Sequence, residues 1–239
     1  MTARAALALA LALSALPARG AEESGARAPE PPSSPARAVG MAEVGLGWLV
    51  LPAADVCVER DIAGCTTGDS SFELDAWQIF RLTPRLAFGA GITLGLTPTT
   101  DAPRQDPPGV ERDHSRGYFT VEGVFRYYAI AQDSFDGWIG LTSGLVVVSD
   151  RFESREGRSD RALVGPRGVT IRTEGLTVGL AVGAALPLGP NWSLGAAARY
   201  GSWFLPKEPN TNPLGDEASL VGQNDVLSLV LTVGYRVPL

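Results

Sequence analysis

The side chains of this sequence that could do chemistry are few. The only two cysteines, Cys57 and Cys65, lie close together in one polar segment. An even cysteine pair predicts a disulfide if the chain is exported, as its N-terminus indicates. Closing so small a loop contributes about 2–3 kcal/mol, mostly by stiffening the loop. A metal site is disfavoured, because two thiols without a nearby histidine leave the coordination of a metal ion incomplete.

The only histidine, His114, lies in the run Asp113-His114-Ser115, which invites comparison with a hydrolase. Side chains of adjacent residues on an extended chain point to opposite sides, a poor geometry for a nucleophile and its base. The run also lies in a charged segment. We therefore expect a solvated loop histidine and predict no catalytic residue, no cofactor and no metal site.

A second set of charged residues lies within otherwise apolar segments. Five such residues alternate with small and apolar neighbours: Glu43, Glu122, Arg126, Arg199 and Arg236. What they do depends on the elements that position them. Those elements are strands, because the apolar residues recur with a period of two.

Eight segments show this alternation. We place strands at 41–51, 72–82, 86–97, 117–128, 138–149, 169–186, 192–204 and 225–237. The connections are alternately short (83–85, 131–136, 187–190) and long (52–71, 98–116, 150–168, 205–224). This layout is typical of a transmembrane barrel with short periplasmic turns and long outer loops. The sequence predicts an all-β fold, an eight-stranded antiparallel up-and-down transmembrane β-barrel.

The two faces of each strand differ in chemistry. In 192–204, Trp192, Leu194 and Tyr200 oppose Ser193 and Arg199. We expect the apolar set to face lipid and the other set to face a narrow lumen. Buried charges must pair or meet water, so the five charged residues predict a lumenal ion-pair network. Lumenal glycines such as Gly91 and Gly183 would leave room for water, which keeps a narrow conducting pore open as an alternative.

The segment 72–82 fits less cleanly. Its parity turns Leu74, Ala76, Gln78 and Phe80 outward, which leaves Trp77 and Ile79 in the lumen and exposes Gln78 to lipid. A β-bulge could reset the register there.

Aromatic residues gather near the predicted strand ends. Trp48, Phe72, Phe119, Tyr200, Trp203 and Phe204 lie toward the long loops, and Phe80, Phe88, Tyr127, Trp138, Trp192 and Tyr235 lie toward the short turns. Amphipathic rings at both interfaces form the two aromatic girdles of an outer-membrane barrel.

The N-terminus reads as a secretory signal peptide over residues 1–20, with Arg4, an apolar run and the cleavage site Ala18-Arg19-Gly20. Residues 21–40 are rich in proline and predict a disordered leader, and the barrel takes residues 41–239. The formal net charge is −6. An acidic chain argues against nucleic-acid binding, which requires a basic face.

With these residues in hand, the chain resembles the small eight-stranded outer-membrane proteins of Gram-negative bacteria, which include the OmpA transmembrane domain and OmpX- and OmpW-like barrels. The C-terminal Gly234-Tyr235-Arg236-Val237-Pro238-Leu239 is similar to their assembly signal, although Val233 replaces a polar residue and Leu239 an aromatic one. The resemblance implies a bacterial outer-membrane location. It also implies contact with outer-membrane lipid and lipopolysaccharide, and recognition of the last strand by the outer-membrane assembly machinery.

The expected function is a non-enzymatic structural or surface-interaction role through the long extracellular loops. The first alternative is a porin-like narrow channel or transporter for small, hydrophobic solutes, as the OmpW-like resemblance implies. A lipid A-modifying enzyme and a soluble secreted binding barrel are the further alternatives. The sequence leaves the oligomeric state open.

Overall fold

The computed structural model describes residues 38–55, 67–96, 99–100, 112–154, 168–213, 216–218 and 220–239. All described residues belong to one compact unit, Ala36–Leu239. The expected signal peptide, nearly all of the expected leader, and both Cys57 and Cys65 lie outside the described residues.

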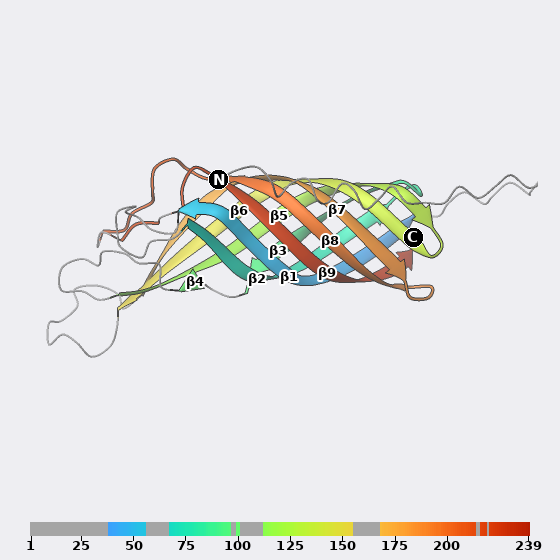
Figure 1. Ribbon diagram of the computed structural model, residues 1–239, viewed down its shortest axis with the longest axis horizontal. Coiled ribbons are helices and arrows are strands. Elements are labelled where there is room, and N and C mark those ends of the chain that lie inside the picture. The colour runs from blue at the N-terminus through green and yellow to red at the C-terminus, as the bar shows by residue number, and fades with distance from the viewer. Residues whose placement is uncertain are drawn as a thin grey trace, which may run out of the picture. The chain divides into compact units, whose positions relative to one another are not determined.

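The described residues form nine strands in one sheet (Figure 1). They are β1 (Val39–Asp55), β2 (Thr67–Arg81), β3 (Leu86–Gly95), β4 (Thr99–Thr100), β5 (Arg112–Gln132), β6 (Phe135–Ser154), β7 (Gly168–Pro187), β8 (Trp192–Phe204) and β9 (Gln223–Pro238). Strand β4 has two residues and pairs with β5 beyond the end of β3. The other eight are the long strands of the fold.

The eight long strands close into a ring. Consecutive long strands pair antiparallel, and β1 also pairs with β9, which joins the first strand to the last. Each long strand therefore has two hydrogen-bonded neighbours, which satisfies the backbone groups as a hydrocarbon environment demands. The predicted fold class, an eight-stranded up-and-down barrel, is confirmed.

Exposure alternates along the strands, with the apolar side outside. On β9, the side chains of Leu229 and Leu231 are 64% and 69% exposed, whereas Val230 between them is 1% exposed. Contiguous exposed leucines and valines would be a liability in water, but they are what a lipid-facing barrel surface requires. No helix in the described part of the chain is long and apolar enough to span a membrane.

The register of β2 resolves the ambiguity of the sequence. The pairing of β2 with β3 is unbroken from Glu73 to Arg81, and the one irregularity between β1 and β2 lies farther along, between Leu51 and Asp55. The suggested bulge near Gln78 is therefore wrong. The alternation of inward and outward side chains continues without a break: Trp77 and Ile79 are buried, and Gln78 lies exposed on the outer face.

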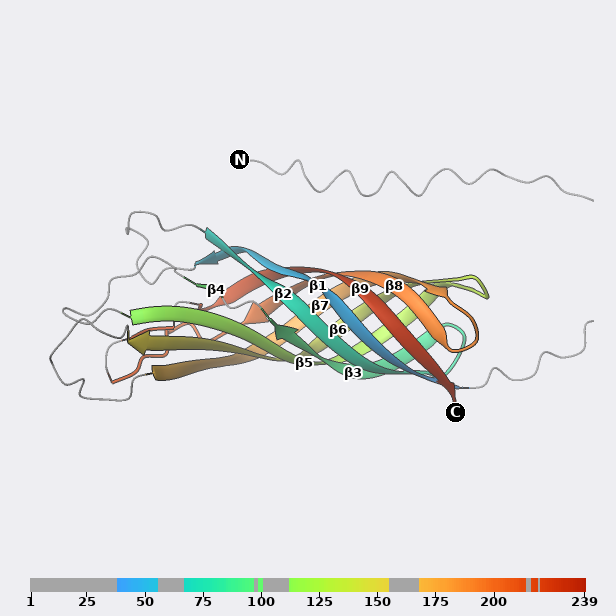
Figure 2. The ribbon, with the colours of Figure 1, turned by 90° about the horizontal axis from the view of Figure 1, so that it is seen from below.

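Several strands are longer than the sequence predicts. Strand β5 begins at Arg112 and β6 continues to Ser154, into the connections expected at 98–116 and 150–168, whereas β7 begins at Gly168, within one residue of its expected start. Figure 2 shows these three strand ends reaching beyond β8 and β9. In these extensions the inward side chains other than Phe152 are polar (His114, Arg116 and Asp150), as are the outward ones, so the apolar alternation that marks a strand is lost. At the other end, the connection expected at 131–136 shrinks to a turn at Asp133 and Ser134.

Candidate functional site

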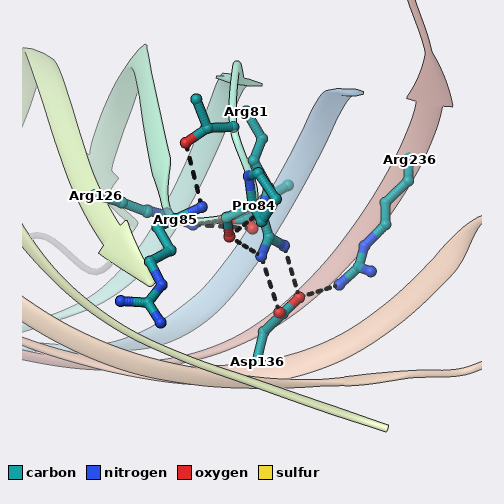
Figure 3. Close-up of polar contacts among 8 residues, drawn as sticks. Arg81, Pro84, Arg85, Arg126, Asp136 and Arg236 are labelled. Atoms are coloured by element: carbon teal, nitrogen blue, oxygen red, sulfur yellow. Dashed lines mark hydrogen bonds and ion pairs between the residues drawn. The ribbon is translucent and has the colours of Figure 1, made fainter. Parts of the chain in front are cut away.

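At the short-turn end of the lumen, two arginines share one carboxylate (Figure 3). Arg81 Nη1 of β2 lies 3.0 Å from Asp136 Oδ2 of β6, and Arg236 Nη2 of β9 lies 2.9 Å from the same oxygen. The Arg81 guanidinium also lies 3.9 Å from the centre of the Tyr128 ring, and its Nε donates to the carbonyl of Pro84. These contacts join three strands that are far apart in sequence.

A second ion pair crosses the lumen above this cluster. Arg126 Nη1 lies 2.8 Å from Glu43 Oε2, and both side chains are buried. The Arg126 guanidinium stacks 3.9 Å from the centre of the Trp138 ring. The ring in turn lies over Gly183, where any Cβ would overlap it.

Two lumenal glycines therefore make room for aromatic rings. Gly91 faces Trp77 in the same way that Gly183 faces Trp138. Each glycine is the direct cross-strand partner of its tryptophan. The expectation that Gly91 and Gly183 leave room for water is wrong, because indole rings fill that room.

The middle of the lumen holds a third charged group. Arg199 Nη2 lies 3.1 Å from Glu73 Oε1 and 2.9 Å from Asp75 Oδ2. Glu122 of β5 also points into the lumen, where it accepts a hydrogen bond from Thr177 Oγ1 at 3.1 Å. All three carboxylates are buried.

Toward the long loops the lumen turns apolar. The buried cluster there comprises Leu49, Leu51, Ala54, Tyr118, Val146, Val148, Trp203, Leu205, Leu220 and Val226. Leu205 and Leu220 come from the connection between β8 and β9. Two backbone hydrogen bonds join the two ends of that connection: Leu205 N donates to Gly222 O at 2.8 Å, and Gly222 N donates to Pro206 O at 2.9 Å. The connection thus contributes side chains to the lumenal core.

The long-loop end carries a buried polar cluster that the sequence did not predict. His114 Nε2 lies 2.7 Å from Asp150 Oδ1, and Arg116 Nε lies 2.8 Å from the same oxygen. The imidazole stacks on Phe152 with ring centres 4.8 Å apart. The expected solvated loop histidine is wrong: His114 belongs to β5 and is buried.

This cluster lies beyond the apolar belt of the outer face. The outward neighbours on β6 and β7 at this level include Arg151, Arg172 and Glu174, all exposed. Burial alone would raise the pKa of Asp150. The hydrogen bond from His114 and the charge of Arg116 outweigh burial, so the pKa of Asp150 is lowered from its ordinary value.

All five charged residues expected in the lumen face inward. The structure pairs Glu43 with Arg126, but it gives Arg199 and Arg236 the partners Glu73, Asp75 and Asp136. Glu73 and Asp75 could have been found, because the parity of 72–82 already turned them inward. Asp136 was missed because it was placed in a turn.

The aromatic residues divide between the two faces. Trp48, Phe88, Trp192, Tyr200 and Tyr235 are exposed on the outer surface, and Phe119 and Tyr127 are partly exposed there. Trp203 and Trp138 are buried in the lumen, so their assignment to the girdles is wrong. Both follow the parity of their strands, which the girdle assignment overlooked. That the exposed rings lie at membrane interfaces stays a prediction.

The part of the chain that the structure describes contains no group of three or more His, Cys, Asp or Glu residues able to hold a metal ion. The predicted disulfide falls on residues outside that part. The His114 cluster offers an acid and an imidazole, and its neighbouring Ser115 points to the other face of β5.

The sequence matches no protein-family model and no curated protein. Its structure is similar to that of a major outer membrane protein from Thermus thermophilus, at 15% identity and a TM-score of 0.53, over 84% of this chain and 99% of that one. It is also similar to Neisserial surface protein A (13% identity, TM-score 0.48, 84% and 97% of the chains) and to OprG from Pseudomonas aeruginosa (14%, 0.44, 84% and 97%). The Thermus protein is an outer membrane protein, and the fold of this chain is the β-barrel fold that the two share.

Proposed function

We propose that this chain is a non-enzymatic outer-membrane β-barrel that acts at the cell surface through its long-loop end. The observation that carries the proposal is the change of chemistry along β6 and β7. Their outer faces are apolar, except for Ser143, up to Val147 and Leu176 and are polar or charged beyond, while the strands themselves continue to Ser154 and Gly168. A wall that continues past its apolar belt presents a rigid polar surface to the outside.

The proposal includes the routes by which the chain reaches that position. Residues 1–20 direct export, and the C-terminal strand β9 is recognised by the assembly machinery. Cys57 and Cys65 form a disulfide in the first long loop, and the outer face contacts lipid and lipopolysaccharide. Export through an oxidising periplasm is consistent with such a disulfide.

A narrow channel is the alternative that the lumen argues against. Three charged groups cross the lumen in succession, and the apolar cluster around Trp203 fills its long-loop end. An eight-stranded barrel is just wide enough for its side chains to fill it. Planar-bilayer recordings separate the two functions: we expect no stable openings, and steady single-channel currents from the pure protein would favour the channel.

Lipid A modification is the remaining alternative. Its candidate group is the His114–Asp150 pair, which is stacked under Phe152 and buried. Arg116 shares the Asp150 carboxylate, so the pair is engaged in a structural network. Incubation of the purified barrel with lipopolysaccharide should leave lipid A unchanged. A product that disappears in His114→Ala would overturn the non-enzymatic proposal.

The location is tested by fractionation of cells that express the full chain. We expect the protein in the outer-membrane fraction, with a heat-modifiable migration in detergent gels that reports a closed barrel. Recovery from the soluble periplasm would instead support a soluble binding barrel.

A further inference from the structure

The middle of the lumen has an excess of negative charge. Glu73, Asp75 and Glu122 are 0%, 2% and 8% exposed, and Arg199 is the one guanidinium that reaches any of them among the described residues. Glu122 makes contacts only with the hydroxyls of Thr177 and Thr120 there. Buried carboxylates require compensating charge, and one arginine cannot balance three.

Two oxygen atoms of these carboxylates also lack a hydrogen-bond partner. Glu73 Oε1 accepts hydrogen bonds from Arg199 and Ser228, but Glu73 Oε2 is buried without a hydrogen-bond partner. Asp75 Oδ1 is likewise buried without a hydrogen-bond partner, while Asp75 Oδ2 accepts a hydrogen bond from Arg199. Such an orphaned oxygen costs free energy unless a further group occupies the space beside it.

That space exists. A cavity of about 40 Å³ lies in the lumen, lined in part by Glu73, Glu122 and Arg199. Since one water needs roughly 10–15 Å³ of such space, the cavity accommodates a small ion with one or two waters. Four threonines also line it: Thr93, Thr120, Thr142 and Thr177.

The donor set is entirely oxygen. Thr177 Oγ1 donates its hydrogen to Glu122, which leaves the lone pairs of that hydroxyl free. Carboxylate and hydroxyl oxygens suit hard cations. Because the two carboxylates share the cavity with the Arg199 guanidinium and with neutral hydroxyls, the lining carries a net charge of −1, which fits a monovalent cation better than a divalent one.

We propose that this cavity binds one small hard monovalent cation, of the sodium class, between Glu73 and Glu122. The ion neutralises part of the excess charge and accepts the orphaned Glu73 Oε2 as a ligand. It links β2 to β5 on the inner side of β3, which lies between them in the wall. The proposal is independent of the surface role, because it concerns the stability of the barrel wall.

The first test compares thermal unfolding of the full chain in detergent at constant ionic strength. Sodium chloride should raise the midpoint by about 3 °C over N-methyl-D-glucamine chloride. Glu122→Gln and Thr142→Val should abolish the difference, and the exposed Glu153→Gln should keep it. An equal midpoint in both salts would overturn the proposal. So would a Glu122→Gln variant that is more stable in every salt, because a proton would then balance the charge.

The second test needs no variant. Crystals of the native protein grown in thallium acetate should show an anomalous peak in the cavity between Glu73 and Glu122. A cavity without such a peak would contradict the proposal even if every variant failed to fold. Calcium or magnesium that displaced thallium at micromolar concentration would assign the site to divalent ions and also contradict it.

Discussion

The indole ring of Trp138 on β6 lies against Gly183, its direct cross-strand partner on β7, where any side chain would overlap the ring. The pair supports the stack of Arg126 on Trp138 and thereby the ion pair to Glu43. A glycine opposite a tryptophan is thus part of the lumenal packing, and the same arrangement recurs at Gly91 and Trp77.

Gly183→Ala should destabilise the barrel by about 1–3 kcal/mol, because the added Cβ forces the Trp138 ring out of position. The free energy of unfolding can be measured with urea in lipid vesicles. Gly123→Ala is the matched control, since a Cβ there meets nothing closer than 3.8 Å. Equal free energies of unfolding for the two variants would contradict the prediction, because the Trp138 ring could then move aside without cost.

Arg126→Met should cost about 3–5 kcal/mol, because it leaves the buried Glu43 carboxylate without its partner. The double variant with Glu43→Leu should recover most of that loss in the same unfolding assay. Arg151→Met is the control, since the ion pair of Arg151 with Glu153 is exposed and contributes less than about 1 kcal/mol. A double variant as unstable as Arg126→Met would refute the coupling.

The long-loop end should loosen in acid. Because the pKa of Asp150 is lowered in the folded state, its carboxylate stabilises the fold above the ordinary value of 3.8, and this contribution is lost as the pH falls through the lower folded value. Hydrogen exchange of the β5 and β6 ends should accelerate below about pH 4. Asp150→Asn should show fast exchange already at neutral pH, whereas the exposed Glu153→Gln should behave as the native protein.

Gln78→Leu should stabilise the barrel in lipid by about 1–3 kcal/mol, because the amide faces outward and makes no hydrogen bond to the described residues. Gln223→Leu is the control: this side chain lies at the long-loop end of β9 and its Nε2 donates a hydrogen bond to Ser202 Oγ at 3.5 Å, so the substitution should bring no gain. If Gln78→Leu were destabilising, the outer face around β2 would not contact hydrocarbon.

The sequence was sufficient for the strand number, the antiparallel order and the inward side of each strand, because an apolar-polar alternation with period two reports all three. It failed where both faces are mostly polar, so the ends of β5 and β6 and the His114 cluster were assigned to loops. It also failed for Trp138 and Trp203, where position near a strand end was given more weight than parity. The partners of Arg199 and Arg236 depend on barrel closure, which local sequence does not encode.

The central claim, a membrane-spanning barrel with its long-loop end outside the cell, is tested most directly by labelling single cysteines in intact cells. The reagent is a maleimide polymer too large to cross the outer membrane, and the parent chain controls for Cys57 and Cys65. Arg151→Cys, beyond the apolar belt, should be labelled in intact cells, and Asp133→Cys, in the β5–β6 turn, only after permeabilisation. Labelling of Asp133→Cys but not Arg151→Cys in intact cells would contradict the account.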